Sequence, residues 1–197
     1  GGNEYEGSYH GRDSSGLWKS TDGGTTWSRA LNEQETTGYV EIGDLDIGPD
    51  NRLWAGSRMN AYWAGGGQIF YSDDGVNWTE ANWKSSLGGT PNRALVAVAP
   101  SDANTVYILV SDNEGNVARW FAKSSDGGAN WTEYTVPTDA NGNPLGDGNG
   151  QAGYDLSLGV SATNANVVFA GEIDVFKTTD GGANWTQTTN SGGSQYP

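Results

Sequence analysis

The chain has 197 residues, of which 31 are glycine. Its nine tryptophans, nine tyrosines and four phenylalanines are too many for a disordered chain. The composition therefore predicts a folded, turn-rich, all-β protein. The absence of cysteine excludes disulfides, thiolate metal sites and cysteine nucleophiles, and the single histidine, His10, excludes multi-histidine metal sites. The formal net charge of −14 argues against nucleic acid as a partner, and no apolar run is long enough to predict insertion into a membrane.

Four copies of one motif recur along the chain, with the pattern (Ser or Thr)-x-Asp-Gly-Gly-x-x-Trp and one residue deleted in the second copy. Their aspartates are Asp22, Asp74, Asp126 and Asp180, which lie 52, 52 and 54 residues apart. Four matches at nearly one period indicate a repeat architecture.

Short β-rich runs separated by Asn, Gly and Asp turns predict four strands in each complete repeat. The first motif follows a strand that begins at Leu17, so only two strands are expected before Asn32. The strands of the complete repeats are expected at 43–48, 52–57, 68–72 and 77–81, then at 94–99, 105–111, 117–123 and 131–136, and finally at 155–161, 167–171, 174–177 and 185–188. Four strands in about 50 residues is the periodicity of a β-propeller blade, and no helix is expected.

The strand count predicts an incomplete ring of about three and a half four-stranded antiparallel blades. We expect a half blade at 1–31, complete blades at 32–82, 83–136 and 137–190, and the start of a further connection at 191–197. Propellers close with roughly four to eight blades, and a half blade leaves an unpaired edge. The chain is therefore expected to be a fragment of a larger propeller, with the remainder of that propeller as a partner, and to associate through its open edge.

Each motif is expected to fasten a tight turn. The aspartate accepts backbone N–H bonds within the turn, the glycines supply positive φ angles, and the Ser or Thr hydroxyl adds a second local bond. The tryptophan is expected to cover the turn and to bury apolar surface. Equivalent places around a ring favour a structural role over a catalytic one. These positions are Ser20, Asp22, Gly24 and Trp27; Ser72, Asp74, Gly75 and Trp78; Ser124, Asp126, Gly128 and Trp131; and Thr178, Asp180, Gly182 and Trp185.

The four motifs resemble the Asp-box, or bacterial neuraminidase repeat, of sialidases, family 74 glycoside hydrolases and sortilin-type propellers. The stretches Val98-Ala-Pro-Ser-Asp-Ala-Asn-Thr-Val-Tyr107 and Val160-Ser-Ala-Thr-Asn-Ala-Asn-Val-Val-Phe169 look most like secreted bacterial proteins of this kind. The resemblance covers essentially the whole chain. It implies a β-propeller in a secreted or cell-surface bacterial protein, with the motifs between the third and fourth strands, away from the ligand. These families share a scaffold and differ in chemistry, so the resemblance leaves the function open.

Aromatic and basic residues gather in segments that are expected to join strands on the ligand-binding face. Rings of this kind stack on the C–H faces of sugars, while charged groups bond to the hydroxyls. The alternative is that these side chains only pack the loops. The candidate ligand-binding residues are Arg58, Tyr62, Trp63, Trp83, Arg93 and Tyr154.

Two carboxylates, Asp46 and Asp155, are candidates for catalysis. Asp46 stands where the other innermost strands carry small residues, and Asp155 aligns with Arg93 at the mouth of the expected channel. A glycosidase needs two carboxylates at a defined separation, which Asp155 and either Asp46 or Asp44 supply only if the fold brings them close. The alternative is solvated or structurally bonded aspartates. Neither the sialidase arginine motif nor the catalytic-aspartate motifs of family 74 match, and His10 is expected to be a loop residue.

One acidic loop has the spacing of a metal site. Asp139, Asn141, Asn143 and Asp147 space their oxygen atoms like the front of a calcium loop. Pro144 stands in place of the usual glycine, and the bidentate glutamate of such loops is missing. The alternative is a polar loop, so calcium is the one cofactor that the sequence leaves open.

Two functions therefore remain. The first is a carbohydrate-binding or adhesive scaffold of a secreted or cell-surface protein, with a glycan, a polysaccharide or another surface protein as partner. The second is part of a glycoside hydrolase that acts on polysaccharide. The remainder of the reading frame discriminates between them, through a second channel carboxylate or a surface anchor.

Overall fold

The computed structural model describes residues 16–31, 34–35, 38–60, 64–83, 88–147 and 150–189. Over these residues the regular structure is almost entirely β-strand, which confirms the all-β prediction. The exception is the four-residue helix α1 (Ala152–Asp155), so the prediction that no helix forms is wrong here. The N–H groups of Tyr154 and Asp155 both donate to the Gln151 carbonyl, which delays the strand that was expected to start at residue 155.

The strands form three four-stranded antiparallel sheets and two hairpins, and each four-stranded sheet lies within one predicted blade, although the blade boundaries themselves stay predictions. Within each sheet the strands follow chain order, so that every sheet is a meander. The sheets are β5 (Glu41–Ile47), β6 (Leu53–Arg58), β7 (Ile69–Ser72) and β8 (Thr79–Glu80); β9 (Ala94–Ala99), β10 (Asp102–Ser111), β11 (Ala118–Ser124) and β12 (Thr132–Tyr134); and β13 (Ser157–Val160), β14 (Val168–Gly171), β15 (Val175–Thr178) and β16 (Thr186–Gln187). The hairpins are β1 (Leu17–Lys19) with β2 (Ser28–Leu31), and β3 (Gln34–Glu35) with β4 (Gly38–Tyr39).

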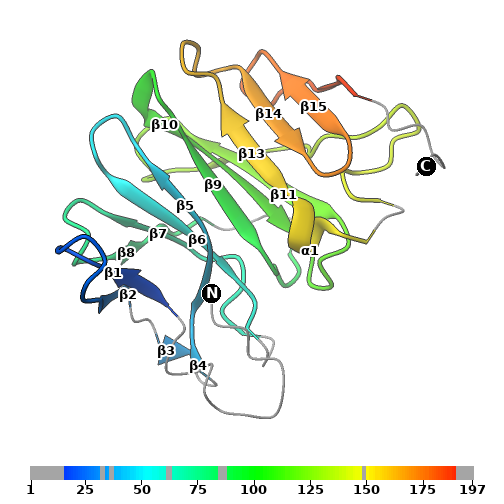
Figure 1. Ribbon diagram of the computed structural model, residues 1–197. Coiled ribbons are helices and arrows are strands. Elements are labelled where there is room, and N and C mark those ends of the chain that lie inside the picture. Colours follow the sequence, from blue (N-terminus) through cyan, green and yellow to red (C-terminus); the bar gives the residue numbers. More distant parts are fainter. Residues whose placement is uncertain are drawn as a thin grey trace.

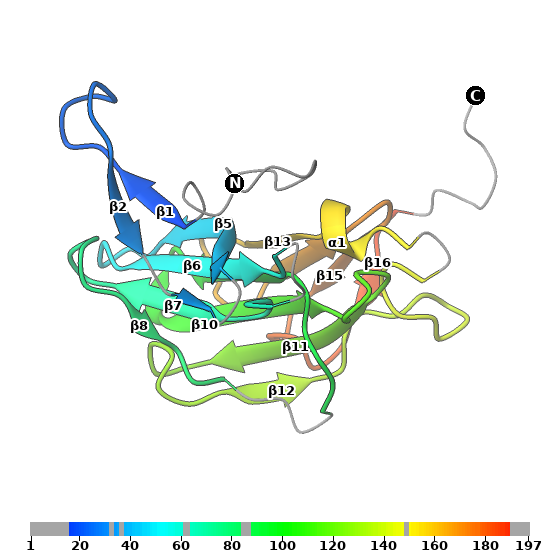
Figure 2. The same ribbon diagram turned by 90° about the horizontal axis from the view of Figure 1, so that it is seen from below.

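The three sheets stand next to one another like the vanes of a fan. Their first strands, β5, β9 and β13, lie side by side, and the later strands of each sheet lie progressively farther from this line (Figures 1 and 2). The β1–β2 hairpin lies at one end of the fan and the β14–β15 pair at the other (Figure 1).

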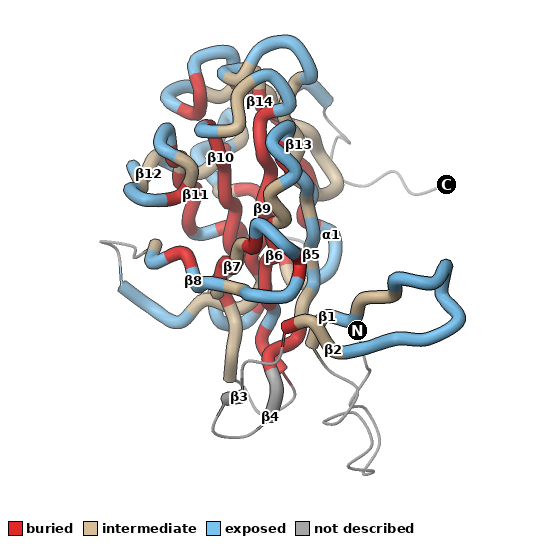
Figure 3. Tube along the Cα trace, turned by 90° about the vertical axis from the view of Figure 1, so that its left-hand side faces the viewer, coloured by how far each residue is buried: buried red, intermediate tan, exposed pale blue. Residues whose placement is uncertain are grey.

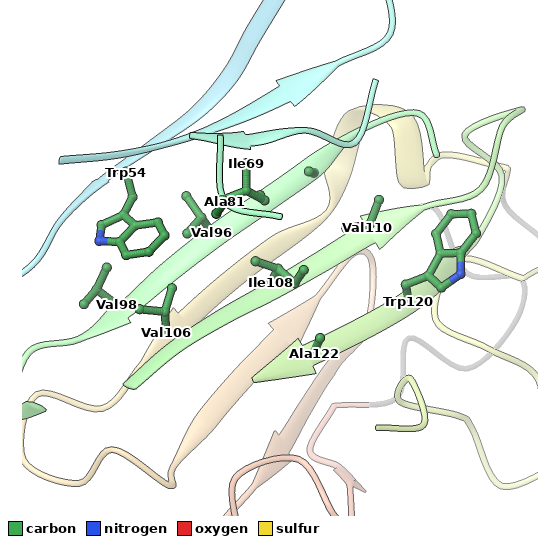
Figure 4. Packing of buried hydrophobic residues seen from close by; sticks show 11 residues of the cluster. Trp54, Ile69, Ala81, Val96, Val98, Val106, Ile108, Val110, Trp120 and Ala122 are labelled. Carbon is green, nitrogen blue, oxygen red and sulfur yellow. The ribbon is translucent and has the colours of Figure 1, made fainter. Parts of the chain in front are cut away.

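The middle sheet is buried on both faces because it is packed between two others. Val106, Ile108 and Val110 of β10 belong to the apolar cluster shared with the β5–β8 sheet (Figure 4). Tyr107 and Leu109, on the opposite face of the same strand, belong to the cluster shared with the β13–β16 sheet. A strand that alternates between two cores reads as a continuous apolar run. The burial map shows the result, with buried residues along the strands and exposed residues at the turns (Figure 3).

Neighbouring sheets approach closely at glycines. A Cβ atom at Gly56 of β6 would collide with the carbonyl oxygen of Ala94 in β9, so no larger residue fits there. A Cβ at Gly128 would lie 2.5 Å from the buried ring of Trp54. These glycines set how tightly the sheets pack.

Within the described ranges, no helix has the length and apolar character needed to cross a bilayer.

Candidate functional site

Charged side chains converge at the end of the fan where β5 and β9 begin and β6 ends. Glu41 and Arg58 are register partners across β5 and β6, and the Arg58 Nε lies 3.7 Å from the Glu41 Oε2. Glu41 is buried, with 8% of its surface exposed, whereas the side chain of Arg58 is 45% exposed. The stem of Arg58 lies over Gly43, where a Cβ would make ordinary contacts at 3.6 Å with three of its carbons.

Arg93 links this pair to the next sheet. Its guanidinium donates a short hydrogen bond to the carbonyl oxygen of Tyr154 in α1. Burial lowers the pKa of Arg93, and the charge of Arg58 acts in the same direction, while the carboxylates of Asp44 and Asp155 oppose it. The structure therefore brings together Arg58, Arg93 and Asp155, which the sequence had singled out for two different roles. We call Glu41, Asp44, Arg58, Arg93 and Asp155 the charged cluster.

The aspartates of β5 bridge two sheets. The Asp44 Oδ2 accepts the Val96 N–H at 2.8 Å, and the Asp46 Oδ2 accepts the Val98 N–H at 2.7 Å. These N–H groups lie on the edge of β9 that does not pair with β10, where they would otherwise lack an acceptor. The second oxygen of Asp46 accepts the N–H of Ile47 at 2.8 Å. Both oxygens of Asp46 are thus bonded to backbone, which favours the structural alternative for this residue.

Asp44 differs from Asp46 in its electrostatic environment. Burial raises the pKa of Asp44, although the Val96 and Leu45 N–H groups and the positive charge of Arg93 act against this rise. A pKa raised by burial is the direction of shift that a carboxyl acting as a general acid requires.

A cleft of about 340 Å³ lies at the same end of the fan, between the β5–β8 and β9–β12 sheets, and none of its lining residues belongs to the charged cluster. Trp83 contributes its ring, donates its indole N–H to the Gly67 carbonyl at 2.8 Å, and meets Trp120 edge-on with the ring centroids 6.4 Å apart. The indole N–H of Trp120 is buried and has no acceptor among the described residues. The remaining lining residues are Gly66, Gln68, Glu80, Gly88, Gly89 and Pro91.

The other predicted ligand-binding residues have different outcomes. Tyr154 is 71% exposed beside Arg93, so its ring is free to contact a ligand. Trp83, by contrast, is half-buried against the core and is only partly available. Tyr62, Trp63 and His10 lie outside the described residues.

The motif turns occupy the opposite ends of the strands. Antiparallel order places the ends of β1, β7, β11 and β15, where the motifs begin, away from the starts of β5, β9 and β13. In the first turn the Ser20 hydroxyl donates to Asp22 at 2.8 Å and accepts the Gly24 N–H at 2.8 Å. The same hydroxyl-to-carboxylate bond measures 3.1, 2.8 and 2.7 Å in the other three turns, and the motif glycines have φ between 67° and 104°.

The motif carboxylates are held ionised by their own turns. The Thr26 hydroxyl and N–H, with the Ser20 hydroxyl, lower the pKa of Asp22 to about 2. The side chain and N–H of Asn184, with the Thr178 hydroxyl, do the same for Asp180. These bonds support the structural role that the sequence suggested.

The tryptophans of the motifs bury less than expected. Trp78, Trp131 and Trp185 are half-buried against the core clusters, and the prediction of a buried ring is wrong for Trp27, which is 59% exposed. The position of Trp185 explains why Trp27 is exposed. Trp185 packs edge-on against Phe121 of the preceding sheet, and the two ring centroids lie 5.1 Å apart. Among the described residues no sheet precedes the β1–β2 hairpin, so Trp27 has nothing comparable to pack against.

The loop considered for calcium is closed by its own hydrogen bonds. The Asp139 Oδ1 accepts the N–H groups of Asn141 and Asn143 at 2.8 and 2.9 Å, and its Oδ2 accepts both side-chain amides at 3.4 and 3.2 Å. The amides thus turn their N–H₂ groups toward the carboxylate. Within the described segments no group of three or more Asp, Glu, His or Cys residues has metal-binding geometry, and Asp147 lines a small pocket with Asp139 and Glu172.

Two residues of this region were not singled out from the sequence. The role of Glu41 follows from its position opposite Arg58 in the β5–β6 hairpin. A prediction of the strand register in that hairpin would have identified the pair. Trp120 begins the consecutive apolar run Trp120-Phe121-Ala122 of β11, so the sequence predicts a core residue, and only 2% of its surface is exposed.

No protein-family model and no curated protein matches the chain. Among solved structures, an ancestral GH74 enzyme is similar over 89% of this chain and 21% of its own length, with 18% identity and a TM-score of 0.58. The GH74 xyloglucanase from Xanthomonas campestris is similar over 90% of this chain and 27% of its own length, with 17% identity and a TM-score of 0.55. This chain therefore spans about a fifth to a quarter of those proteins. At such identity the likeness concerns the fold, and together with the fanned four-stranded meanders it shows that the chain is part of a β-propeller.

Proposed function

We propose that this chain is a carbohydrate-binding segment of a secreted or cell-surface β-propeller, and that it binds glycan where the inner strands begin. The observation that carries the proposal is the convergence of Arg58, Arg93 and Asp155, from three separate segments, beside the exposed ring of Tyr154. Guanidinium and carboxylate groups supply the donors and acceptors that sugar hydroxyls need, and the tyrosine ring offers a stacking surface.

Three further facts support a site at this end of the fan. The cleft beside Trp83 is a hollow lined by aromatic rings at the same end of the fan. The motif turns at the other end bond to themselves and to neighbouring sheets, which leaves few groups for a ligand. A protein with the same fold, the xyloglucanase from Xanthomonas campestris, is named for its action on a polysaccharide.

The binding proposal is tested with a panel of polysaccharides and oligosaccharides. Tyr154→Ala removes an exposed ring, and Arg58→Lys removes the guanidinium while keeping a positive charge near the buried Glu41, so both variants should fold and bind more weakly, by about tenfold each if their contacts are used. Val76→Ala trims an exposed side chain, 63% exposed against 71% for Tyr154, in a motif turn at the opposite end, and it should bind like the unaltered protein. Equal binding by all three variants would contradict the site.

A glycoside hydrolase is the second candidate, and the raised pKa of Asp44 beside Arg93 favours it. Asp44 would then act as the acid, with Asp155 as the second carboxylate. This function would be established if the unaltered chain released reducing sugar and if Asp44→Asn and Asp155→Asn abolished that release. Asp46→Asn is the control and should keep the activity, because Asp46 lies outside the charged cluster and its oxygens bond to backbone. Absence of both binding and hydrolysis across the panel would favour a protein-interaction propeller.

A further inference from the structure

The connection from β8 to β9 joins the cleft to the charged cluster. β8 is the outermost strand of its sheet and β9 is the innermost strand of the next, so this connection leads from the rim of the fan to its inner line of strands. Trp83 and Pro91 of the connection line the cleft, and Arg93, two residues beyond Pro91, belongs to the charged cluster. Two residues of extended chain span at most about 7 Å, so the two places are neighbours on one surface.

Backbone contacts form a floor between the two places. A Cβ atom at Gly66 would collide with the carbonyl oxygens of Pro91 and Asn92, so the loop before β7 lies directly against the β8–β9 connection. The N–H of Met59, the residue after Arg58, donates to the Asn92 carbonyl at 2.9 Å. The cleft and both arginines of the charged cluster are therefore attached to one hydrogen-bonded floor.

Further hydrogen bonds fix the position of this floor. The Asn92 N–H donates to the Ser111 carbonyl at 3.2 Å, and the Arg93 N–H donates to the Ser111 hydroxyl at 3.0 Å. At the rim, the bond from the Trp83 indole to the Gly67 carbonyl holds the aromatic ring. A surface that is held in this way loses little conformational freedom when a ligand binds.

The cleft has room for a small chemical unit. Its volume of about 340 Å³ lies at the lower end of the range of roughly 300–1,000 Å³ for small-molecule sites. The half-buried ring of Trp83 and the ring of Pro91 form apolar walls, and a Cβ atom at Gly88 would meet nothing within 4 Å, so the glycine leaves the cleft open. The Gln68 amide and the Glu80 carboxylate lie among these walls. A flat apolar surface beside hydrogen-bonding groups is the combination that a sugar ring uses.

The charges along this surface favour a neutral ligand. The charged cluster contains three carboxylates and two guanidinium groups, and Glu80 adds a carboxylate at the cleft. The guanidinium of Arg119 lies 5.2 Å from the centre of the Trp120 ring and adds one positive charge near the cleft. Carboxylates remain in excess, so an acidic sugar would be repelled.

We infer that the ligand is a neutral oligosaccharide or polysaccharide chain that occupies the charged cluster and the cleft together. One sugar unit lies against Trp83, and the chain follows the floor inward to Arg58 and Arg93. This inference rests on the proposed function and adds to it the class and the length of the glycan. Once one end of such a chain is bound, the other end binds from a high effective concentration, so affinity rises with length until both places are filled.

Calorimetric titration of the full chain with cello-, xylo- and manno-oligosaccharides, from disaccharide to hexasaccharide, tests the inference. For the sugar that binds, affinity should rise by at least about tenfold with length and then level off. Trp83→Leu removes the stacking ring, and Gly88→Asn puts a side chain at the cleft, where asparagine tolerates the φ of 63°. Both variants should bind the disaccharide like the unaltered chain, because the charged cluster is intact, and should lose the gain with length.

Gly142→Asn is the matched control, because Gly142 also has a positive φ, 87°, and open space around its Cβ position, but lies in another loop. It should keep the gain with length. Gly88→Asn tests the cleft by itself if Trp83→Leu fails to fold. Affinity that is independent of length, cleft variants that keep the full gain, or tighter binding of oligogalacturonides of the same length would overturn the inference and leave the binding proposal standing. If no oligosaccharide binds, the proposed function fails and the inference fails with it.

Discussion

Asp46 is expected to join two sheets rather than to act on a substrate, and Asp46→Ala tests this directly. The substitution removes the acceptors of two N–H groups. One belongs to Ile47, which is 63% exposed, so water can replace the lost bond. The other belongs to Val98, which is 4% exposed, so its N–H is left without a partner in a region that excludes water.

The magnitude follows from that single buried donor. Leaving it unsatisfied costs about 1–3 kcal/mol of unfolding free energy. Asp46→Asn keeps one acceptor oxygen, which can stay on the buried Val98 N–H while the amide nitrogen takes the place of the oxygen that faces the water-accessible Ile47 N–H, so it should cost about half as much. In a chain of this size each kcal/mol corresponds to roughly 2–4 °C in the unfolding temperature.

Thermal and urea unfolding, followed by tryptophan fluorescence, measure both variants against Leu45→Ala. Leu45 is the neighbour of Asp46 in β5 but is 54% exposed, so its loss should change little. The expected order of destabilisation is alanine at 46, then asparagine at 46, then alanine at 45. An Asp46→Ala variant as stable as the unaltered chain would refute the bridging role, and equal losses for alanine and asparagine would refute the argument from the acceptor.

Three further predictions concern the packing and the turns. Gly56→Ala should destabilise by about 1–3 kcal/mol or prevent folding, because its methyl group meets a backbone carbonyl that has little room to move; circular dichroism with thermal unfolding checks this. Trp185→Ala should cost about 2 kcal/mol, less than for a fully buried ring, while Trp27→Ala should cost under about 1 kcal/mol, and the reverse order in urea unfolding would contradict the burial argument. Because hydrogen bonds within the turns hold the pKa of Asp22 and of Asp180 at about 2, below the usual 3.8, these carboxylates stabilise the fold fully above about pH 4 and lose this effect as the pH falls through 2. Unfolding temperatures should thus decline over that interval, with a shallower decline in Asp180→Asn.

The repeat made the strands predictable because it marks the same point of every sheet. The third strand ends where each motif begins, so the strand expected at 117–123 is observed as β11 (Ala118–Ser124). Prediction failed where a segment departs from the repeat. The turn of helix at Tyr154 and Asp155 has no counterpart in the other sheets, and the pattern of apolar residues around it gives no sign of a helix.

The candidate site was only partly predictable. Arg58 and Arg93 were found because they lie with aromatic residues in the loops expected on the ligand-binding face, and Asp155 was found because it aligns with Arg93 between repeats. The contact between Arg58 and Glu41 depends on strand register, and the burial of Asp44 depends on how closely two sheets approach, which no local pattern specifies. The exposure of Trp27 likewise depends on what precedes the hairpin in space.

The two ends of the fan differ in how much change they tolerate. At the motif end the turns are short, internally bonded and fitted to glycines, so a lengthened turn would lose its bonds and push neighbouring sheets apart. At the other end the connection between β12 and β13 is longer, and it places Leu145, Ala152 and Leu156 in the core shared with the β13–β16 sheet. Altered recognition can therefore be installed there by library selection at exposed positions such as Tyr154, provided that these buried residues are kept.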